Sequence, residues 1–168
     1  MKSGLTIRED NYSVVLDALK QLSGTDVLVG IPAGPPRDDA PLSNAELGYL
    51  QSTGATVEID GETVTLPSRP FLDMGIEDSR DKTTERLKLA AQSALEGKAD
   101  VASMHLEAAG QIARDASKAV IEAGDRLTPL SEKTIKKRRE IKPPIPGDKP
   151  LRARGFLFRA IQYVVRKK

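Results

Sequence analysis

The chain has no cysteine, no tryptophan and a single histidine among its 168 residues. The lack of cysteine excludes disulfides, thiolate metal sites and thiol catalysis. With one histidine, a zinc site would need carboxylates for nearly all of its remaining ligands. No run of 18 apolar residues is present, so no membrane-spanning helix is predicted. The first ten residues contain no apolar signal core, and we expect the chain to stay in the compartment where it is made.

What is present is an ordinary soluble composition with an uneven charge. Residues 125–168 hold 14 Lys and Arg against 4 Asp and Glu, whereas the first 124 residues hold 12 against 20. A basic end on an acidic body suggests nucleic acid or an acidic protein surface as a partner. It also allows self-complementarity, in which the basic end of one copy meets the acidic body of the next around a ring. The remaining alternative is a solvated charged surface that binds no partner.

The first third of the chain alternates between short regular elements and proline-rich breaks. An apolar stripe over 9–22 predicts a helix, and the β-branched run over 26–31 predicts a strand. Four prolines between Pro32 and Pro41 indicate a loop. Ser43, with Glu46 three residues later, is typical of a capping box that starts a short helix ending at Gly54.

A β-hairpin is predicted over 56–66, because two alternating arms flank Asp60-Gly61 and both turn residues tolerate positive φ. Pro67 and Pro70 then break the sheet, and Pro70 forces Arg69 into an extended conformation.

Two long helices are predicted next, over 75–96 and 100–123. Alanine is frequent in the second, which would let a neighbouring helix approach closely. The apolar side chains that we expect to face the core are Ile76, Leu87, Ala91 and Leu95 in the first helix and Val101, Met104, Ala108, Ile112, Ala119 and Val120 in the second.

The last part of the chain is basic and rich in proline. A short basic helix is predicted over 132–140, irregular structure up to residue 154, and a terminal strand over 161–166 that pairs with the strand at 26–31. We therefore expect one α+β domain, a small antiparallel sheet packed by two long helices, with extended proline-rich loops. Its parts are an N-terminal helix (1–24), a strand, short helix and hairpin (25–72), two long helices (75–123), a basic proline-rich loop (124–154) and a C-terminal strand (155–168).

Residues that could carry catalysis are few. His105 lies in a predicted helix. We expect it to be a surface or interface residue and not a catalytic base or metal ligand. No serine stands in a G-x-S-x-G motif, so a triad hydrolase has no nucleophile elbow. Residues 30–36 follow a strand but lack the glycine spacing and terminal Lys-Ser/Thr of a phosphate-binding loop. Asp38-Asp39 is the nearest thing to a magnesium site, although a solvated loop pair is the simpler reading.

A dense basic cluster occupies the short helix predicted near the C-terminus, and three of its lysines share one helical face. Such residues suffice for phosphate contacts, so non-specific DNA affinity is an open alternative. Aromatic side chains for base stacking are absent from the cluster. Its members are Lys133, Lys136, Lys137, Arg138 and Arg139.

Three stretches in this order resemble one family, the tail completion or neck proteins of long-tailed bacteriophages, which also include head-tail joining and virion morphogenesis proteins. The first is Val27-Leu28-Val29-Gly30-Ile31-Pro32. The second joins Asn44-Ala45-Glu46-Leu47-Gly48-Tyr49-Leu50 and Gly54 to Leu66-Pro67-Ser68-Arg69-Pro70-Phe71-Leu72. The third joins Thr128-Pro129-Leu130-Ser131 and Thr134-Ile135 to Lys149-Pro150-Leu151, Gly155, Leu157 and Ile161. The resemblance spans about residues 25–165.

The resemblance implies a virion protein of the neck that performs no catalysis and needs no cofactor or metal. Its partners would be identical copies in a hexameric ring, the head connector, the tail terminator or tail tube, and packaged DNA through non-specific contact; no membrane is involved. It would lie at the head-tail junction, and in the host cytoplasm during assembly. The residues expected at subunit or partner interfaces are Arg69, Pro70, Phe71, Thr128, Pro129, Leu130, Lys133, Lys136, Lys137, Arg138, Arg139, Lys149, Pro150, Leu151, Arg154 and Gly155.

Two readings from other classes stay open. The chain could be a small DNA-binding accessory protein that uses the basic segment 133–142, or a nuclease whose Asp38 and Asp39 hold magnesium. If the resemblance holds, we expect the planar guanidinium group of Arg69 to bind a carboxylate or carbonyl groups. We also expect the loops 32–41 and 128–154 to become ordered against neighbouring subunits.

Overall fold

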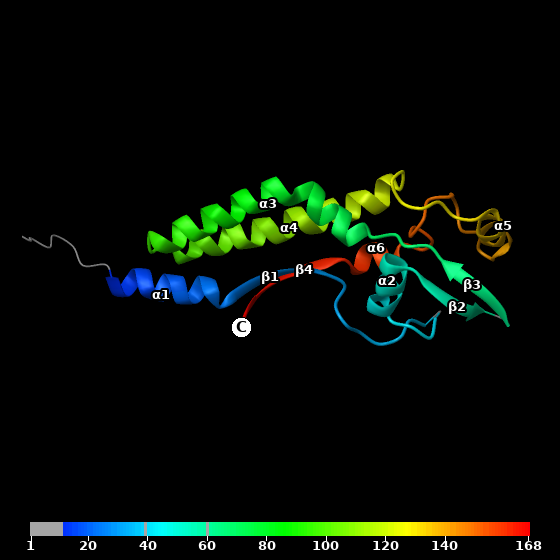
Figure 1. Ribbon diagram of the computed structural model, residues 1–168, viewed down its shortest axis with the longest axis horizontal. Helices are drawn as coiled ribbons and strands as arrows, with labels where there is room; N and C mark the ends of the chain where they lie inside the picture. Colours follow the sequence, from blue (N-terminus) through cyan, green and yellow to red (C-terminus); the bar gives the residue numbers. More distant parts are fainter. Residues whose placement is uncertain (1–11, 39, 60) are drawn as a thin grey trace, which may run out of the picture.

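A pair of long antiparallel helices forms the body of the molecule, as seen in a computed structural model that describes residues 12–38, 40–59 and 61–168 (Figure 1). Helices α3 (Phe71–Leu95) and α4 (Ala99–Ala123) pack along their whole length. Small residues line their contact, and a Cβ built on Gly75 would lie 2.3 Å from the Ser117 Cα. The small residues buried on the two helices are Gly75, Ser79, Ala90 and Ala94 of α3 and Ala102, Ala109, Gly110, Ala113 and Ser117 of α4.

The large apolar side chains that were expected inside this pair are mostly exposed, so that part of the prediction is wrong. Ile76, Leu87 and Leu95 of α3 retain more than two fifths of their surface, and Met104 of α4 is 69% exposed. Small residues let the two backbones approach closely, which turns the longer side chains outward. Helix α3 also begins at Phe71, four residues before the expected Gly75, because the extended Arg69-Pro70 segment leads directly into it.

The terminal strand pairs with the first strand as expected. Strands β1 (Thr25–Gly30) and β4 (Gln162–Lys167) are antiparallel, with Val27 opposite Val165 and Leu28 opposite Val164. One face of this ribbon packs on α4, where Gly110 makes room for the Tyr163 ring and Val27. Leu28 and Val164 are exposed on the other face. Helix α4 packs on both strands of the ribbon, and α1 contacts β1.

The N-terminal helix α1 (Tyr12–Ser23) lies beside α3 and leads into β1 (Figure 1). It ends one residue later than predicted, and residues 9–11 of the predicted helix lie outside the described residues. The proline-rich loop that follows β1 is held within the same chain. The Arg37 guanidinium lies 4.5 Å from the centre of the Phe156 ring, and the Arg37 amide donates to the Leu42 carbonyl.

A capping box starts helix α2 (Asn44–Thr53), as the sequence predicts. The Ser43 Oγ accepts from the Glu46 amide at 3.2 Å, and the Glu46 carboxylate accepts from the Ser43 amide at 2.8 Å. Gly54 ends the helix at a φ of 77°. A Cβ there would lie 2.9 Å from the Leu66 carbonyl oxygen. Both the positive φ and this close contact therefore require glycine at the position.

This capping box predicts a pH dependence. The hydrogen bonds from the Ser43 amide and hydroxyl lower the pKa of Glu46 below its ordinary value of 4.5. A lowered pKa contributes stability above the ordinary pKa, and that contribution is lost as the pH falls through the lowered value. We expect wild type to be more stable than Glu46→Gln at neutral pH, and this difference in urea unfolding to shrink as the pH falls below 4.5. A difference that stays constant with pH would contradict the capping role of the carboxylate.

The hairpin is confirmed as strands β2 (Ala55–Ile59) and β3 (Glu62–Leu66), with Val57 opposite Val64. Of its expected turn residues, Asp60 lies outside the described residues and Gly61 has a φ of 77°. The hairpin and the β1–β4 ribbon are separate sheets, so the single small sheet that was expected is divided in two. In Figure 1 the hairpin extends from the end of the molecule opposite α1.

The hydrophobic core lies where the start of α3, the end of α4 and the C-terminal segment meet. It contains Phe71, Val120, Ile121, Leu127, Leu157 and Ile161. Leu157 belongs to α6 (Phe156–Ala160), a short helix that the sequence reading did not predict. Gly155 precedes this helix at a φ of 72°. The turn at Gly155 therefore leads into the helix, and the strand β4 follows the helix. The basic helix α5 (Glu132–Glu140) is confirmed.

Candidate interaction site

Arg69 connects the central segment of the chain to the start of the C-terminal segment. Its Nε donates to the Thr128 carbonyl at 2.7 Å and its Nη2 to the Pro129 carbonyl at 3.0 Å. Its Nη1 donates to the Gln51 Oε1 at 3.1 Å. The side chain is buried, and the expected fork on carbonyl groups is found within one chain. Burial, and to a smaller extent the nearby Arg138, lowers the pKa of Arg69.

Arg138 is the second buried arginine, and it fastens α5 to the proline-rich segment. Its Nη1 donates to the Lys149 carbonyl at 3.1 Å, and its own carbonyl accepts from the Ile145 amide. Burial lowers the pKa of Arg138. Arg138 therefore differs from the other members of the basic cluster, which are exposed.

A cavity of about 560 Å³ lies between the hairpin, α2, α5 and α6, and Arg37, Arg69 and Arg138 all line it. The first turn of α5 lines it too, through Ser131 and Thr134. Most of the remaining lining is leucine, valine and proline. No Asp or Glu belongs to the lining among the residues that the structure describes. We call this space the arginine cavity.

The structure brings the central and C-terminal motifs together around the arginine cavity. Pro129, Leu130 and Leu151 line it beside Arg69 and Arg138. Gln51 and Arg37 also belong to the site, and the sequence reading missed both. Nothing in the sequence indicates Gln51, whereas Arg37 lies in the loop expected to dock on a neighbour.

Several residues that were expected at interfaces lie inside the molecule. Phe71 has no exposed surface and sits in the core, and Pro150 is buried. Pro70 and Gly155 are half-buried at the starts of α3 and α6. Thr128 is exposed and donates from its hydroxyl to the Ser68 carbonyl.

The exposed basic residues differ in their pairing. Lys133 binds the Glu62 carboxylate at 2.8 Å, which raises the pKa of Lys133 and lowers that of Glu62. The Lys149 Nζ donates to the Glu122 carbonyl at 2.7 Å. Lys136, Lys137 and Arg139 are exposed on α5 without an ion pair in the described part of the chain, and Arg154 is exposed as well.

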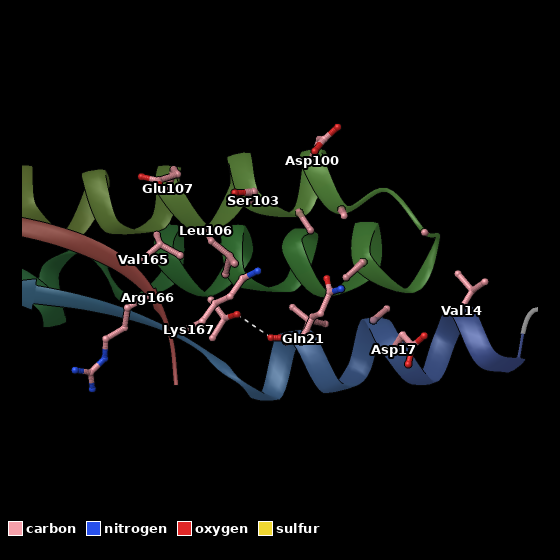
Figure 2. Close-up of a pocket in the computed structure, with 17 residues that line it drawn as sticks. Val14, Asp17, Gln21, Asp100, Ser103, Leu106, Glu107, Val165, Arg166 and Lys167 are labelled. Atoms are coloured by element: carbon pink, nitrogen blue, oxygen red, sulfur yellow. Dashed lines mark hydrogen bonds between the residues drawn. The ribbon is translucent and has the colours of Figure 1, made fainter.

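A second cavity, of about 520 Å³, separates α1 from the α3–α4 turn and from β4. Figure 2 shows Asp17, Asp100 and Glu107 around it, with Lys167 reaching across from β4. Val14 and Leu106 contribute apolar surface. Arg166 lines this cavity as well, and its mixed charge differs from the arginine cavity, which has no acidic residue in its described lining.

The catalytic alternatives gain no support from the described residues. His105 is half-buried on α4. Asp38 is exposed, whereas Asp39 lies outside the described residues, so the proposed magnesium pair is not described as a whole. Over residues 12–38, 40–59 and 61–168, no group of three or more His, Asp or Glu is placed to hold a metal. In the same ranges, no helix is long and apolar enough to cross a bilayer.

No protein-family model matches the chain, and no curated protein or solved structure matches it either. The α+β class is shown by the structure itself, and function has to be argued from the site.

Proposed function

We propose that this chain is a structural protein of the neck of a long-tailed bacteriophage, which completes the tail or joins it to the head connector. The observation that carries the proposal is the Arg69 fork. It joins the two motifs of the resemblance, the Arg69-Pro70-Phe71 stretch and Thr128-Pro129, although 59 residues separate Arg69 from Thr128. This contact supports the resemblance, because it brings two of its motifs together in the fold.

Exposed apolar side chains support an assembly role. Leu28 and Val164 face outward from the β1–β4 ribbon, and Leu95, Val101 and Met104 do so near the α3–α4 turn. Leu28 and Val164 stand opposite each other in the ribbon, and contiguous apolar surface is typical of contacts between proteins. A ring of identical copies would cover it, and the chain would act by docking, without converting a substrate.

The direct test is the position of the protein in finished particles. Antibody labelling of virions produced by the phage that encodes this chain is expected to mark the head-tail junction. When the gene is deleted, filled heads and free tails are expected to accumulate unjoined. Particles that are infectious without the protein, or labelling elsewhere in the virion, would overturn the proposal.

The exposed face of α5 predicts a charge-reversal effect. Changing Lys136, Lys137 and Arg139 to glutamate is expected to weaken ring assembly or docking and to leave the free energy of unfolding within about 0.5 kcal/mol. Arg138 must be left intact, because it is buried and its reversal would perturb the fold. The matched control reverses Lys82, Arg86 and Lys88 on α3, which are also exposed. Equal assembly by both triple variants, measured as mass in solution, would contradict a role for α5.

The same basic face favours one second candidate, a DNA-binding accessory protein. That function predicts binding of the purified chain to plain duplex DNA, an affinity that falls steeply with salt, and loss of binding in the α5 triple variant. The neck proposal predicts weak binding that the variant changes little. The titration therefore separates the two candidates.

A further inference from the structure

The cavity of about 520 Å³ beside α1 is bordered by apolar side chains that the described chain leaves partly exposed. All 12 residues of α1 are described, and none of them is buried. Val14, Ala18 and Leu22 stand at every fourth position, so one face of α1 lines the cavity. Leu106 of α4 and Val165 of β4 line it as well. We call this space the α1 cavity, and its apolar lining favours a partner that brings apolar side chains.

Three carboxylates stand at the rim of the α1 cavity. Asp17, Asp100 and Glu107 line it, and all three residues are exposed (Figure 2). Asp100 has no ion pair with the residues that the structure describes, and Asp17 lies 3.8 Å from the Lys20 Nζ in an exposed pair that contributes little. A hydrogen bond with Glu107 raises the pKa of the Tyr163 hydroxyl, so Glu107 is already engaged within its own copy. Asp17 and Asp100 therefore remain available to a cation.

The positive charges in the lining do not cancel these carboxylates. Arg166 lies 3.8 Å from the Asp26 carboxylate, and Asp26 does not belong to the described lining. In Figure 2 the Arg166 side chain points away from α4, whereas Lys167 reaches across from β4. One amine thus faces three carboxylates among the described lining residues, so the α1 cavity attracts a cationic partner.

The matching chemistry is exposed on residues 136–144, which we call the α5 segment. It comprises the second half of α5 and the start of the proline-rich stretch. Ile141 is 38% exposed, and Pro143 and Pro144 are exposed after it. Cations beside apolar side chains match an apolar cavity with an acidic rim. Against one exposed acid, Glu140, the segment carries four exposed cations that have no ion pair in the described part of the chain, namely Lys136, Lys137, Arg139 and Lys142.

The α1 cavity and the α5 segment lie too far apart to meet within one copy. Helix α5 lies at the end of the molecule opposite α1 and the α3–α4 turn (Figure 1). The 25 residues of α4 run between these two ends and span about 37 Å. A contact between them therefore joins two copies through different surfaces, and such a heterologous contact forms a ring when its rotation closes.

We propose that the α1 cavity of one copy binds the α5 segment of a neighbouring copy. The exposed cations of the segment lie at Asp17 and Asp100, and Ile141 packs on the apolar lining. This inference rests on the proposed ring assembly, and it specifies which surfaces of the two copies meet.

Charge exchange between two variants tests the pairing by native mass spectrometry. The α5 variant carries glutamate at positions 136, 137 and 139, and the cavity variant carries Asp17→Lys and Asp100→Lys. Each variant alone places like charges on both sides of the contact, and neither is expected to assemble at a concentration where wild type is fully assembled. A 1:1 mixture is expected to assemble with equal numbers of the two variants, because every contact then joins opposite charges. A single chain with all five changes is expected to assemble by itself.

A matched control places the same reversal on the exposed face of α3. Asp81→Lys combined with Glu85→Lys is expected to assemble as wild type does, and to give no assembly when mixed with the α5 variant. Asp17→Asn combined with Asp100→Asn removes the two charges without reversing them, and it is expected to raise the dissociation constant between copies about tenfold.

The lack of cysteine in the chain allows a test of position. Asp100→Cys and Lys137→Cys proteins are assembled together and treated with a short thiol-reactive cross-linker. The expected product is a covalent dimer that contains one of each. With Glu85→Cys in place of Asp100→Cys, no such dimer is expected.

The outcomes separate this inference from the proposed function. A wild-type ring that forms equally well with the cavity variant, or a mixture of the two variants that stays unassembled although both keep their helix content by circular dichroism, overturns the inference and leaves the ring intact. If the cavity variant loses helix, the asparagine variant and the cross-link decide in its place. Wild-type protein that stays monomeric overturns the ring itself.

Discussion

Replacing Arg69 with alanine is expected to lower the free energy of unfolding by about 3 kcal/mol, because hydrogen bonds to a charged donor are lost and their acceptors are left without it. The three acceptors are the Thr128 and Pro129 carbonyls and the Gln51 side chain. Arg69→Lys is expected to recover little of this loss, since an ammonium group cannot reproduce the planar fork.

Urea unfolding at one fixed protein concentration measures this effect, with Arg80→Ala as the control. Arg80 forms an exposed ion pair with Glu77, and its loss is expected to cost less than about 1 kcal/mol. Equal stabilities of Arg69→Lys and wild type would show that charge alone, without the fork, holds the two segments together.

Gly75→Ala is expected to destabilise the protein by about 3 kcal/mol, near the upper end for an overpacked core. The added Cβ would lie 2.3 Å from the Ser117 Cα and 2.4 Å from its backbone nitrogen, so α3 and α4 have to move apart. Because these atoms belong to the backbone, a second change, Ser117→Gly, is not expected to rescue the variant.

The control for this prediction is Gly34→Ala, since a Cβ at Gly34 meets nothing within 4 Å. Its free energy of unfolding is expected to match that of wild type within about 0.5 kcal/mol. A Gly75→Ala protein as stable as the Gly34 variant would contradict the close approach of the two helices.

Local chemistry explains which elements the sequence could predict. The capping box at Ser43 and Glu46 and the hairpin depend on neighbouring residues, and simple alternation predicts the strand β4. The pairing of β4 with β1 was also predicted, although it joins distant parts of the chain. The capping box, the hairpin and this pairing are confirmed. The missed helix α6 is only five residues long and follows a glycine, which leaves too little sequence for a helical period.

The packing of the long helices could not be predicted from hydrophobicity alone. A stripe of large apolar residues normally marks the buried face, but here glycine, serine and alanine allow closer contact, and Ile76 and Met104 face outward. The alanines of α4 predict close approach of a neighbouring helix. The positions of these alanines do not predict which helix packs against that face of α4.

The candidate site depends on contacts across the chain. The extended conformation at Arg69 follows from Pro70, but Thr128 is 59 residues away and only the fold brings it near. In the sequence, Arg138 does not differ from the four basic residues near it, which are exposed in the structure. The one signal that could have singled it out is its position three residues after the half-buried Ile135, which places both on one helical face.

Native mass spectrometry of the purified full-length chain, combined with electron microscopy, measures whether copies of this protein form a ring. We expect a closed ring whose mass is a whole multiple of the protomer and whose centre is open. A protein that remains monomeric at every concentration and in the presence of its head connector would contradict it.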